Sequence, residues 1–296
     1  MRQIPRRPHP FRRRKNRTGL VLLTLAALLF VIQYSVRAVL REDTQAETAT
    51  ETLPPTTELN ALAAVQPSAS PTVTLTELLT QNSDITTNYY FRKISSTTPL
   101  VQNPDTSMVA ASVPKLITAT YAFRQIDAGN LSLTRNLGDF DVEWQLDQLL
   151  RQSNNISLEL FFTLFGRDSI RSFAKNDLGL ASYDIDSNML SAGDAASILE
   201  RLYTGTLLSE KSTGMMLSFL QNTYNETYIP AALNPDDSVY HKVGEYEDFV
   251  HDASVIVRNG EPYLLVIMTS GNGYPDYPRR TQYLRDLTRA FLEGSN

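Results

Sequence analysis

A serine and a lysine three residues apart are the first side chains here whose types and spacing indicate chemistry. Ser112 and Lys115 belong to the tetrad Ser-Val-Pro-Lys, which leads into an apolar run at 116–123. If a helix begins here, positions i and i+3 share one face, and the amine can reach the hydroxyl. Pro114 fits the first turn, because its missing N–H would have no intrahelical partner there. The tetrad therefore predicts a nucleophile beside its base.

The spacing is weak evidence when it stands alone. A second Ser-x-x-Lys, formed by Ser172 and Lys175, occurs in a chain that has only six lysines. An exposed serine and lysine on an ordinary helix would explain either pair. Further motifs must therefore decide between the two copies.

The composition excludes several other chemistries. There is no cysteine, which rules out disulfides, a cysteine nucleophile and thiolate metal sites. The histidines, His9, His241 and His251, have no spacing typical of metal ligands. No Gly-x-Ser-x-Gly accompanies them, which disfavours a Ser-His-Asp triad. We expect neither a metal nor any other cofactor.

The charge is unevenly distributed along the chain. Residues 1–17 carry eight basic side chains and no acid, whereas the whole chain has 27 basic and 32 acidic residues. The remainder is therefore acidic, which argues against nucleic-acid binding. Thr18 to Val36 contains no charge and is long enough to cross a bilayer as a helix. With a positive flank on one side only, it predicts a cytoplasmic N-terminus and an extracytoplasmic body.

A cleavable signal peptide is the alternative reading of this apolar run, but the run is long for one and no clean Ala-x-Ala site follows. We therefore expect an uncleaved anchor. The next stretch is rich in Thr, Pro and Ala and lacks an apolar periodicity, which is typical of a linker. The chain is thus predicted to comprise a basic cytoplasmic tail (1–17), a transmembrane helix (18–40), a disordered linker (41–77) and a folded domain (78–296).

The predicted elements of the folded domain change type along the chain. Two strands are followed by helices, then by three strands and a last helix; Asn259-Gly260 is a strong hairpin signal between the last two strands. This order predicts an α+β fold, with an antiparallel sheet built from both ends of the domain and an inserted helical lobe. The expected strands are 88–95, 100–102, 239–244, 249–258 and 262–270, and the expected helices begin at Ser112 and span 142–151, 158–165, 168–178, 192–203 (capped by Ser191), 210–221 and 279–291.

Two more short motifs follow the first tetrad in order. They are Ser153-Asn154-Asn155, between two predicted helices, and Lys242-Val243-Gly244, on the first of the three late strands. The ordered set resembles the Ser-x-x-Lys, Ser-Asp-Asn and Lys-Thr-Gly motifs of class A β-lactamases and penicillin-binding proteins. The sequence around each motif, at 110–133, 152–166 and 241–257, is also similar to that family. The resemblance covers about residues 80–293.

The resemblance implies a role for each polar residue of the motifs. Ser112 would be the nucleophile and Lys115 its base, with a pKa lowered by burial and by a second lysine nearby. Ser153 would pass a proton to the leaving nitrogen, and Asn155 would hold the substrate amide. Lys242 would attract the carboxylate that β-lactams share with D-Ala-D-Ala peptide ends.

Two backbone positions complete the implied site. The oxyanion hole would be formed by the N–H groups of Ser112 and Glu245. Gly244 would allow a substrate backbone to approach the strand closely.

Three departures from the family pattern bear on activity. Asn154 replaces the usual Asp and keeps hydrogen-bonding capacity. Val243 replaces the Thr or Ser that contacts the substrate carboxylate, which predicts weaker binding by the worth of one hydrogen bond, about 1 kcal/mol. The loop at 180–190 has no glutamate to activate the deacylating water; Asp184 or Asp186 would be the substitute, unless both only cap turns.

His251 and Asp252 are adjacent on a predicted strand, so their side chains point to opposite faces and a catalytic dyad is not expected.

The sequence therefore predicts a membrane-anchored acyl-serine hydrolase acting outside the cytoplasmic membrane on β-lactams or peptidoglycan stem peptides. Slow deacylation would make it closer to a penicillin-binding protein than to an efficient β-lactamase. The alternative is a catalytically idle domain on the same fold that binds cell-wall peptides or a partner protein. A structural domain with accidental motif matches is the third reading, which the ordered set opposes.

Overall fold

The computed structural model describes residues 73–271 and 277–294. The predicted tail, the predicted membrane span and nearly all of the predicted linker lie outside these residues. Within the described ranges, no helix combines the length and the apolar character needed to cross a bilayer.

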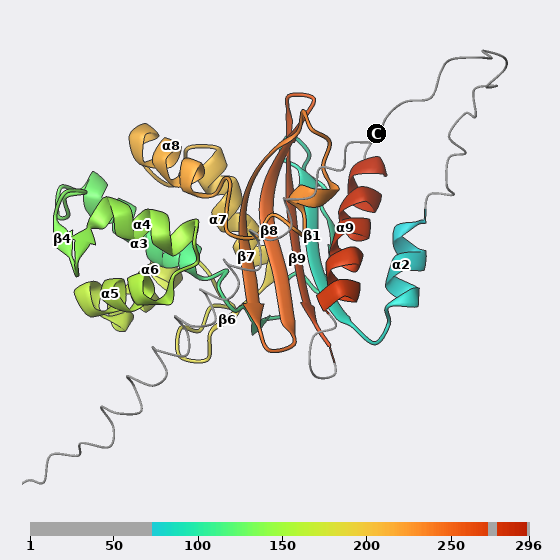
Figure 1. Cartoon of the computed structure of the whole chain (residues 1–296), viewed down its shortest axis with the longest axis horizontal. Coiled ribbons are helices and arrows are strands. Elements are labelled where there is room, and N and C mark those ends of the chain that lie inside the picture. The colour runs from blue at the N-terminus through green and yellow to red at the C-terminus, as the bar shows by residue number, and fades with distance from the viewer. Residues whose placement is uncertain (1–72, 272–276, 295–296) are drawn as a thin grey trace, which may run out of the picture. The chain divides into compact units, whose positions relative to one another are not determined.

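Five antiparallel strands form the main sheet, in the order β2-β1-β9-β8-β7 (Figure 1). The first two strands of the domain thus join the last three in one sheet through the pairing of β1 with β9, as the sequence predicts. The central strands β8 and β9 are buried on both faces, which explains their nearly continuous apolar sequences. Asn259 and Gly260 join them with positive φ at both residues, as a two-residue hairpin turn requires. The strands are β1 (Thr86–Lys93), β2 (Leu100–Gln102), β7 (Ser238–Tyr246), β8 (Phe249–Arg258) and β9 (Glu261–Ser270).

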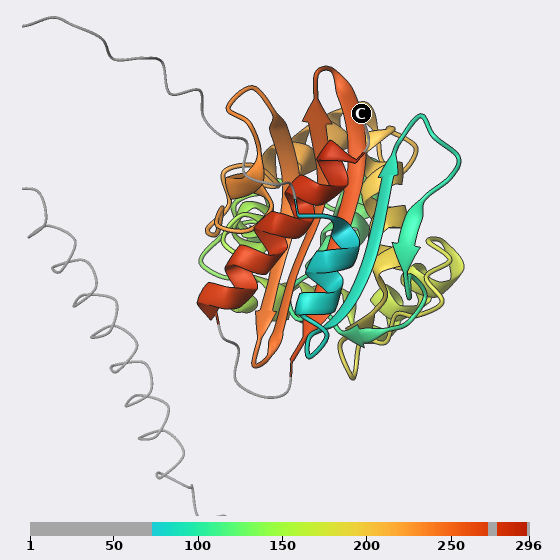
Figure 2. The ribbon, with the colours of Figure 1, turned by 90° about the vertical axis from the view of Figure 1, so that its right-hand side faces the viewer.

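Helices cover both faces of this sheet. The C-terminal helix α9 (Tyr277–Glu293) and the short α2 (Leu75–Gln81) lie on one face, with α9 crossing in front of the strands in Figure 2. Aromatic side chains fill the core between them, where Phe291 packs against Tyr89 and Phe91 of β1. On the opposite face, α7 (Ala192–Tyr203) packs on β1, β8 and β9.

The helical lobe is built around α3 (Lys115–Asp127). Its residues 115–120, 122 and 123 are all buried, because α4, α5, α6 and α8 pack around it. The other lobe helices are α4 (Val142–Leu150), α5 (Asn155–Phe165), α6 (Arg167–Asn176) and α8 (Glu210–Phe219). Small additions that the sequence pattern does not predict are the helix α2, whose first turn lies within the predicted linker, the strand pairs β3 (Met108–Val109) with β6 (Met189–Leu190) and β4 (Asn136–Leu137) with β5 (Phe140–Asp141), and the 3-10 turn η1 (Pro230–Ala232).

The α+β architecture with an inserted helical lobe is therefore confirmed. One local prediction is wrong: the helix expected to begin at Ser112 begins at Lys115. The lobe and the sheet meet at the start of this helix, and the three motifs come together there.

Candidate active site

Ser112 lies in a tight turn immediately before α3, not in the helix. Three backbone hydrogen bonds of the i to i+3 type span residues 110–116, including Lys115 N–H to the Ser112 carbonyl at 3.3 Å. Ala111 has φ +50°, a left-handed conformation that costs a non-glycine residue free energy. Asn188 holds the strained residue in place, because its side-chain amide donates to the Ala111 carbonyl at 2.9 Å. The turn brings the Lys115 Nζ to 3.1 Å from the Ser112 Oγ, as the tetrad spacing predicts.

The Lys115 ammonium group is surrounded by acceptors from the second motif. Its Nζ lies 3.2 Å from the Ser153 Oγ and 2.7 Å from the Asn155 Oδ1, and it also donates to the Ser153 carbonyl. The residue is only 3% exposed. Burial lowers the pKa of Lys115 to about 8, because desolvation penalises its charged form. An appreciable fraction of Lys115 is therefore neutral near pH 7 and able to accept a proton.

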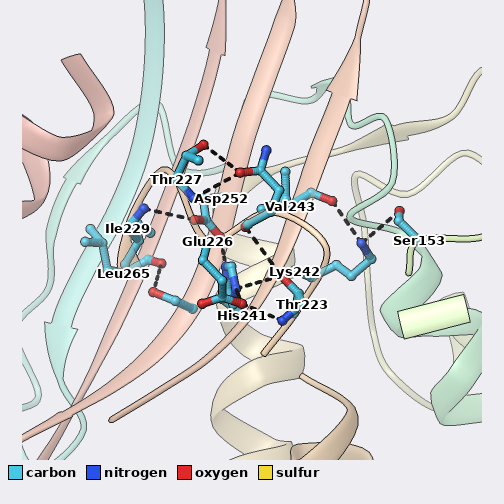
Figure 3. Close-up of polar contacts among 12 residues, drawn as sticks. Ser153, Thr223, Glu226, Thr227, Ile229, His241, Lys242, Val243, Asp252 and Leu265 are labelled. Carbon is cyan, nitrogen blue, oxygen red and sulfur yellow. Dashed lines mark hydrogen bonds and ion pairs between the residues drawn. The ribbon is translucent and has the colours of Figure 1, made fainter. Parts of the chain in front are cut away.

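Ser153 lies between two lysines and joins the helical lobe to the sheet. Lys242 on β7 donates to its Oγ at 2.9 Å, as Figure 3 shows. Ser153 lies in the segment that joins α4 to α5 and has φ +53°, in the left-handed region. Asn154 caps the helix that follows. Its Oδ1 accepts hydrogen bonds from the N–H groups of Ile156 and Ser157 at the start of α5.

Lys242 is almost completely buried. It is 1% exposed, and its Nζ donates to Ser153 and to the carbonyl of Val243 at 3.0 Å. The ring of Tyr224 lies 5.8 Å from the same atom. Burial, and then the charge of Lys115, lower the pKa of Lys242 to about 7.

Gly244 is required by a close approach within the chain itself. A Cβ at this position would lie 2.8 Å from the carbonyl oxygen of Ala110 and 3.1 Å from a methyl group of Val113. The glycine thus lets β7 lie directly against the turn that contains Ser112. The neighbouring Glu245 is half-buried and lines the same cavity as Ser112.

Val243 does not face this cavity, which corrects the interpretation of its departure from Thr. It is 1% exposed and belongs to the apolar core between the sheet and α9, with Tyr228 and Val250. Its side chain serves packing, so no polar contact is missing from the cavity wall at this position.

The carboxylates of the loop at 180–190 are both engaged. Asp184 is exposed and accepts from the Asp186 N–H at 2.9 Å and the Ser187 hydroxyl at 2.6 Å, so it caps a turn. These hydrogen bonds lower the pKa of Asp184. Asp186 lines the cavity but forms an ion pair with Arg171 at 2.8 Å.

A cavity of about 310 Å³ opens at Ser112, Lys115 and Asn155 and extends over α5. Two further carboxylates line it. Glu159, one turn beyond Asn155 on α5, pairs with Arg167 at 3.1 Å, and Glu245 accepts hydrogen bonds from neighbouring side chains. Every carboxylate that lines this cavity in the described part of the chain therefore already has a partner. No cluster of potential metal ligands occurs among the described residues.

The second Ser-x-x-Lys pair lies at the surface of the protein. Ser172 and Lys175 lie on α6, and both are exposed to solvent. The structure thus brings Ser112, Lys115, Ser153, Asn155 and Lys242 together and leaves the other pair outside.

A buried histidine network beside the site was missed at the sequence level. The imidazole of His241 lies 3.0 Å from Asp252 and 3.1 Å from Glu226 (Figure 3). Burial opposes protonation, but Asp252 and Glu226 raise the pKa of His241 to about 9. The register of the β7–β8 hairpin could have indicated this contact. Val243 pairs with Asp252 across the strands, so His241, two residues earlier on β7, is the diagonal neighbour of Asp252.

His251 and Asp252 form no dyad, as expected. The ring nitrogens of His251 lie 2.8 Å from the Val109 carbonyl and 3.0 Å from the Thr269 N–H, and burial lowers the pKa of His251 to about 4. His251 is thus a neutral core residue.

Comparisons with known proteins agree with the fold and with the family that the motifs resemble. The model of the β-lactamase enzyme family matches residues 70–294, well over half of the chain. No curated sequence matches. Among solved structures, a mutant of a protein named PBP-A, determined as an acyl-enzyme complex with penicillin G, has a TM-score of 0.68 at 21% identity and covers 76% of this chain and 98% of its own.

Two enzymes from named organisms are similarly close in fold. A β-lactamase from Sphaerobacter thermophilus has a TM-score of 0.67 at 20% identity, covering 74% of this chain and 95% of its own. One from Burkholderia vietnamiensis has a TM-score of 0.69 at 19% identity, with 75% and 94% covered. At these identities the likeness shows the shared fold, and the family model carries the assignment. This chain belongs to the β-lactamase enzyme family.

Proposed function

We propose that this protein is a serine hydrolase that forms an acyl-enzyme at Ser112 with β-lactams or with D-Ala-D-Ala-type peptidoglycan peptides. The observation that carries the proposal is the pair of buried amines around two hydroxyls. Lys115 lies 3.1 Å from the Ser112 Oγ, and Lys242 lies 2.9 Å from the Ser153 Oγ. Burial depresses the pKa of both lysines, so proton transfer between these groups is feasible near neutral pH.

The chemistry follows from these contacts. Neutral Lys115 takes the proton of Ser112 as the Oγ attacks the substrate carbonyl carbon. The backbone N–H groups of Ser112 and Glu245 would stabilise the oxyanion. As the C–N bond breaks, Ser153 gives its proton to the leaving nitrogen and regains one from the lysines beside it. Water then cleaves the Ser112 ester, releasing the acid and free enzyme.

We propose that this last step is slow. A deacylating water needs a base that can accept its proton. Asp184 caps a turn, Asp186 and Glu159 are in ion pairs, and Glu245 is hydrogen-bonded. The acyl-enzyme should therefore persist, which fits a penicillin-binding protein or a DD-carboxypeptidase of low turnover better than an efficient β-lactamase.

The proposed location is the extracytoplasmic side of the cell membrane. The supporting features are the eight basic residues at 1–17 and the uncharged run that follows them. Peptidoglycan stem peptides would be within reach there, and the linker would hold the domain off the bilayer.

Intact-mass spectrometry of the full-length chain with excess benzylpenicillin tests the function. We expect a single lasting adduct that maps to Ser112. Hydrolysed penicillin without a lasting adduct would overturn slow deacylation. If neither an adduct nor hydrolysed penicillin is found, the result would favour the alternative, a catalytically idle domain that binds cell-wall peptides or a partner protein.

A further inference from the structure

The loop between α8 and η1, residues 220–229, lies along the outer edge of the main sheet and is called the edge loop below. Strand β7 is the last strand in the sheet order, and its His241 N–H donates to the first carbonyl of the loop at 2.8 Å. The same loop contacts the helical lobe, because the Tyr224 N–H donates to the Arg151 carbonyl at 3.0 Å. Arg151 is two residues before Ser153. The edge loop therefore connects the outer strand to the lobe beside the candidate site.

A buried imidazole fastens the edge loop to the sheet, as Figure 3 shows. The His241 Nδ1 lies 3.0 Å from the Asp252 Oδ1 on β8. Its Nε2 lies 3.1 Å from the Glu226 Oε1 and 3.0 Å from the Thr223 hydroxyl, both in the loop. The other carboxylate oxygen of Asp252 accepts from the Ile229 N–H, at the end of the loop, at 3.1 Å. His241 and Asp252 are 0% exposed, so solvent does not compete for these contacts.

The geometry favours a positive charge on His241. Each ring nitrogen faces a carboxylate oxygen, and a neutral imidazole has only one N–H to donate. Burial opposes protonation, but Asp252 and Glu226 raise the pKa of His241 to about 9. Burial also acts to raise the pKa of Glu226, yet the hydrogen bond with His241 lowers it. The cluster is therefore an imidazolium between two carboxylates at neutral pH.

Two cations lie around this cluster. Burial lowers the pKa of Lys242, the next residue on β7, and the charge of Asp252 acts against this effect. Arg285 on α9 donates its Nε to the Thr227 carbonyl of the edge loop at 2.7 Å. Among the described residues, Asp252 and Glu226 are the charged groups that form ion pairs with the ring.

The edge loop also holds the residue that follows the Lys-x-Gly motif. The Glu245 Oε1 accepts from the Asn225 side-chain amide at 2.8 Å and from the Tyr228 hydroxyl. These two residues flank Glu226, so the part of the loop that pairs with His241 also holds Glu245. The backbone N–H of Glu245 is one of the two donors of the proposed oxyanion hole. A displaced loop would therefore move a group that stabilises the oxyanion.

We infer that the charged cluster of His241, Glu226 and Asp252 has a positioning role: it fixes the edge loop and thereby holds the oxyanion donor after the Lys-x-Gly motif in place. The inference rests on the proposed acyl-serine function and adds a requirement to it. No bond forms or breaks at the imidazole, and the proposed nucleophile and base keep their roles. Small movements matter, because oxyanion donors act at about 2.7–3.1 Å from the oxygen that gains charge.

The test uses Glu226→Gln in the full-length chain, which removes the charge and keeps an acceptor oxygen for His241. We expect Ser112 to be acylated by penicillin G about tenfold more slowly than in wild type at pH 8, less than the roughly 10²- to 10³-fold loss of a deleted oxyanion donor. Intact-mass kinetics gives both rates. Glu200→Gln on α7 is the matched control, because this side chain is 33% exposed, against 42% for Glu226, and pairs with Arg92 instead. The control rate should stay within about twofold of wild type.

The pH dependence separates positioning by the ion pairs from a general structural effect. The wild-type ring is charged below its pKa of about 9 and neutral above it, so the ion pairs are lost as the pH rises through this value. The ratio of the wild-type rate to the Glu226→Gln rate should therefore be largest near pH 8 and approach 1 above about pH 10. Titration of Lys115 and Lys242 is common to both proteins and cancels in this ratio. A ratio that is the same at every pH would contradict the positioning role.

Nitrogen-15 NMR of the imidazole reads the charge directly. Both ring nitrogens of His241 should carry a proton at pH 7.5, and a neutral ring would overturn the inference. Equal acylation rates in wild type and Glu226→Gln, or equal losses in Glu226→Gln and Glu200→Gln, would also overturn it while leaving the proposed function intact. No adduct with the wild-type protein would instead refute the proposed function, and the positioning role with it.

Discussion

The two Ser-x-x-Lys pairs of this chain have the same spacing and opposite surroundings. Lys115 is 3% exposed and contacts Ser112, Ser153 and Asn155. Lys175 is exposed on α6, as is Ser172. Burial lowers the pKa of Lys115 to about 8, so part of this lysine is neutral near pH 7. Spacing therefore lets an amine reach a hydroxyl, and burial makes the amine a base.

Removing each serine separately tests most directly whether the two Ser-x-x-Lys pairs differ in function. Ser112→Ala should abolish covalent labelling by a fluorescent penicillin, because no Oγ remains to form the ester. Ser172→Ala should label at the wild-type level, because its hydroxyl is outside the cavity. The gel band intensity of each purified variant measures this. Equal labelling of the two variants would contradict the assignment of Ser112 as nucleophile.

Removing each lysine should give the next largest difference. Lys115→Ala should slow acylation of Ser112 by about 10²- to 10⁴-fold, the usual contribution of a positioned base. Lys175→Ala should leave the rate within about twofold of wild type, because its amine is solvated. Stopped-flow or intact-mass kinetics with penicillin G gives both rates. Comparable losses in the two variants would mean that Lys115 is not the base.

Much of the fold could be predicted because local signals and burial agree. Helix α7 begins at Ala192 after Ser191, whose hydroxyl accepts from the Asp194 N–H, and the sequence pattern gives the same bounds. Strand β8 matches the predicted 249–258 because its apolar run ends at the Asn-Gly turn. Motif order also gives the polar residues of the candidate site, which lie within hydrogen-bonding distance of one another.

Other features depend on tertiary contacts that have no local signal. The turn at Ser112 relies on a left-handed Ala111 held by Asn188, 77 positions later, so the helix start was misplaced. Val243 was expected to face the substrate, but the strand turns it into the core beside α9. The pairing of His241 with Asp252 follows from the strand register, which an adjacent-residue argument cannot reveal.

The pH dependence of acylation should show whether Lys115 acts as the base. Neutral Lys115 is the active form, so protonation removes the base as the pH falls below its pKa of about 8. The acylation rate should therefore drop about tenfold per pH unit between pH 7 and 6, and level off above pH 8 to 9. Rapid-quench intact mass with penicillin G gives the profile. A rate that is flat from pH 6 to 9 would contradict proton transfer to a depressed Lys115.

The smallest expected effect concerns the N-termini of two helices: α5, which follows Ser153, and α6, which carries Ser172 and Lys175. The Asn154 Oδ1 caps α5 at 2.7 Å from the Ile156 N–H, next to Ser153, whereas Gly166 begins α6 without a side-chain cap. Asn154→Ala should lower the free energy of unfolding by about 1 kcal/mol, which corresponds to roughly 2–4 °C in Tm for a domain of this size. Asn154→Asp should keep the stability, because a carboxylate accepts the same hydrogen bonds at a helix N-terminus. Thermal unfolding by circular dichroism measures both variants. If Asn154→Ala unfolds at the wild-type temperature yet acylates more slowly, the cap acts on the position of Ser153 and not on overall stability. The turn at Ser153 is then held in place by local hydrogen bonds that Ser172 and Lys175 on α6 lack.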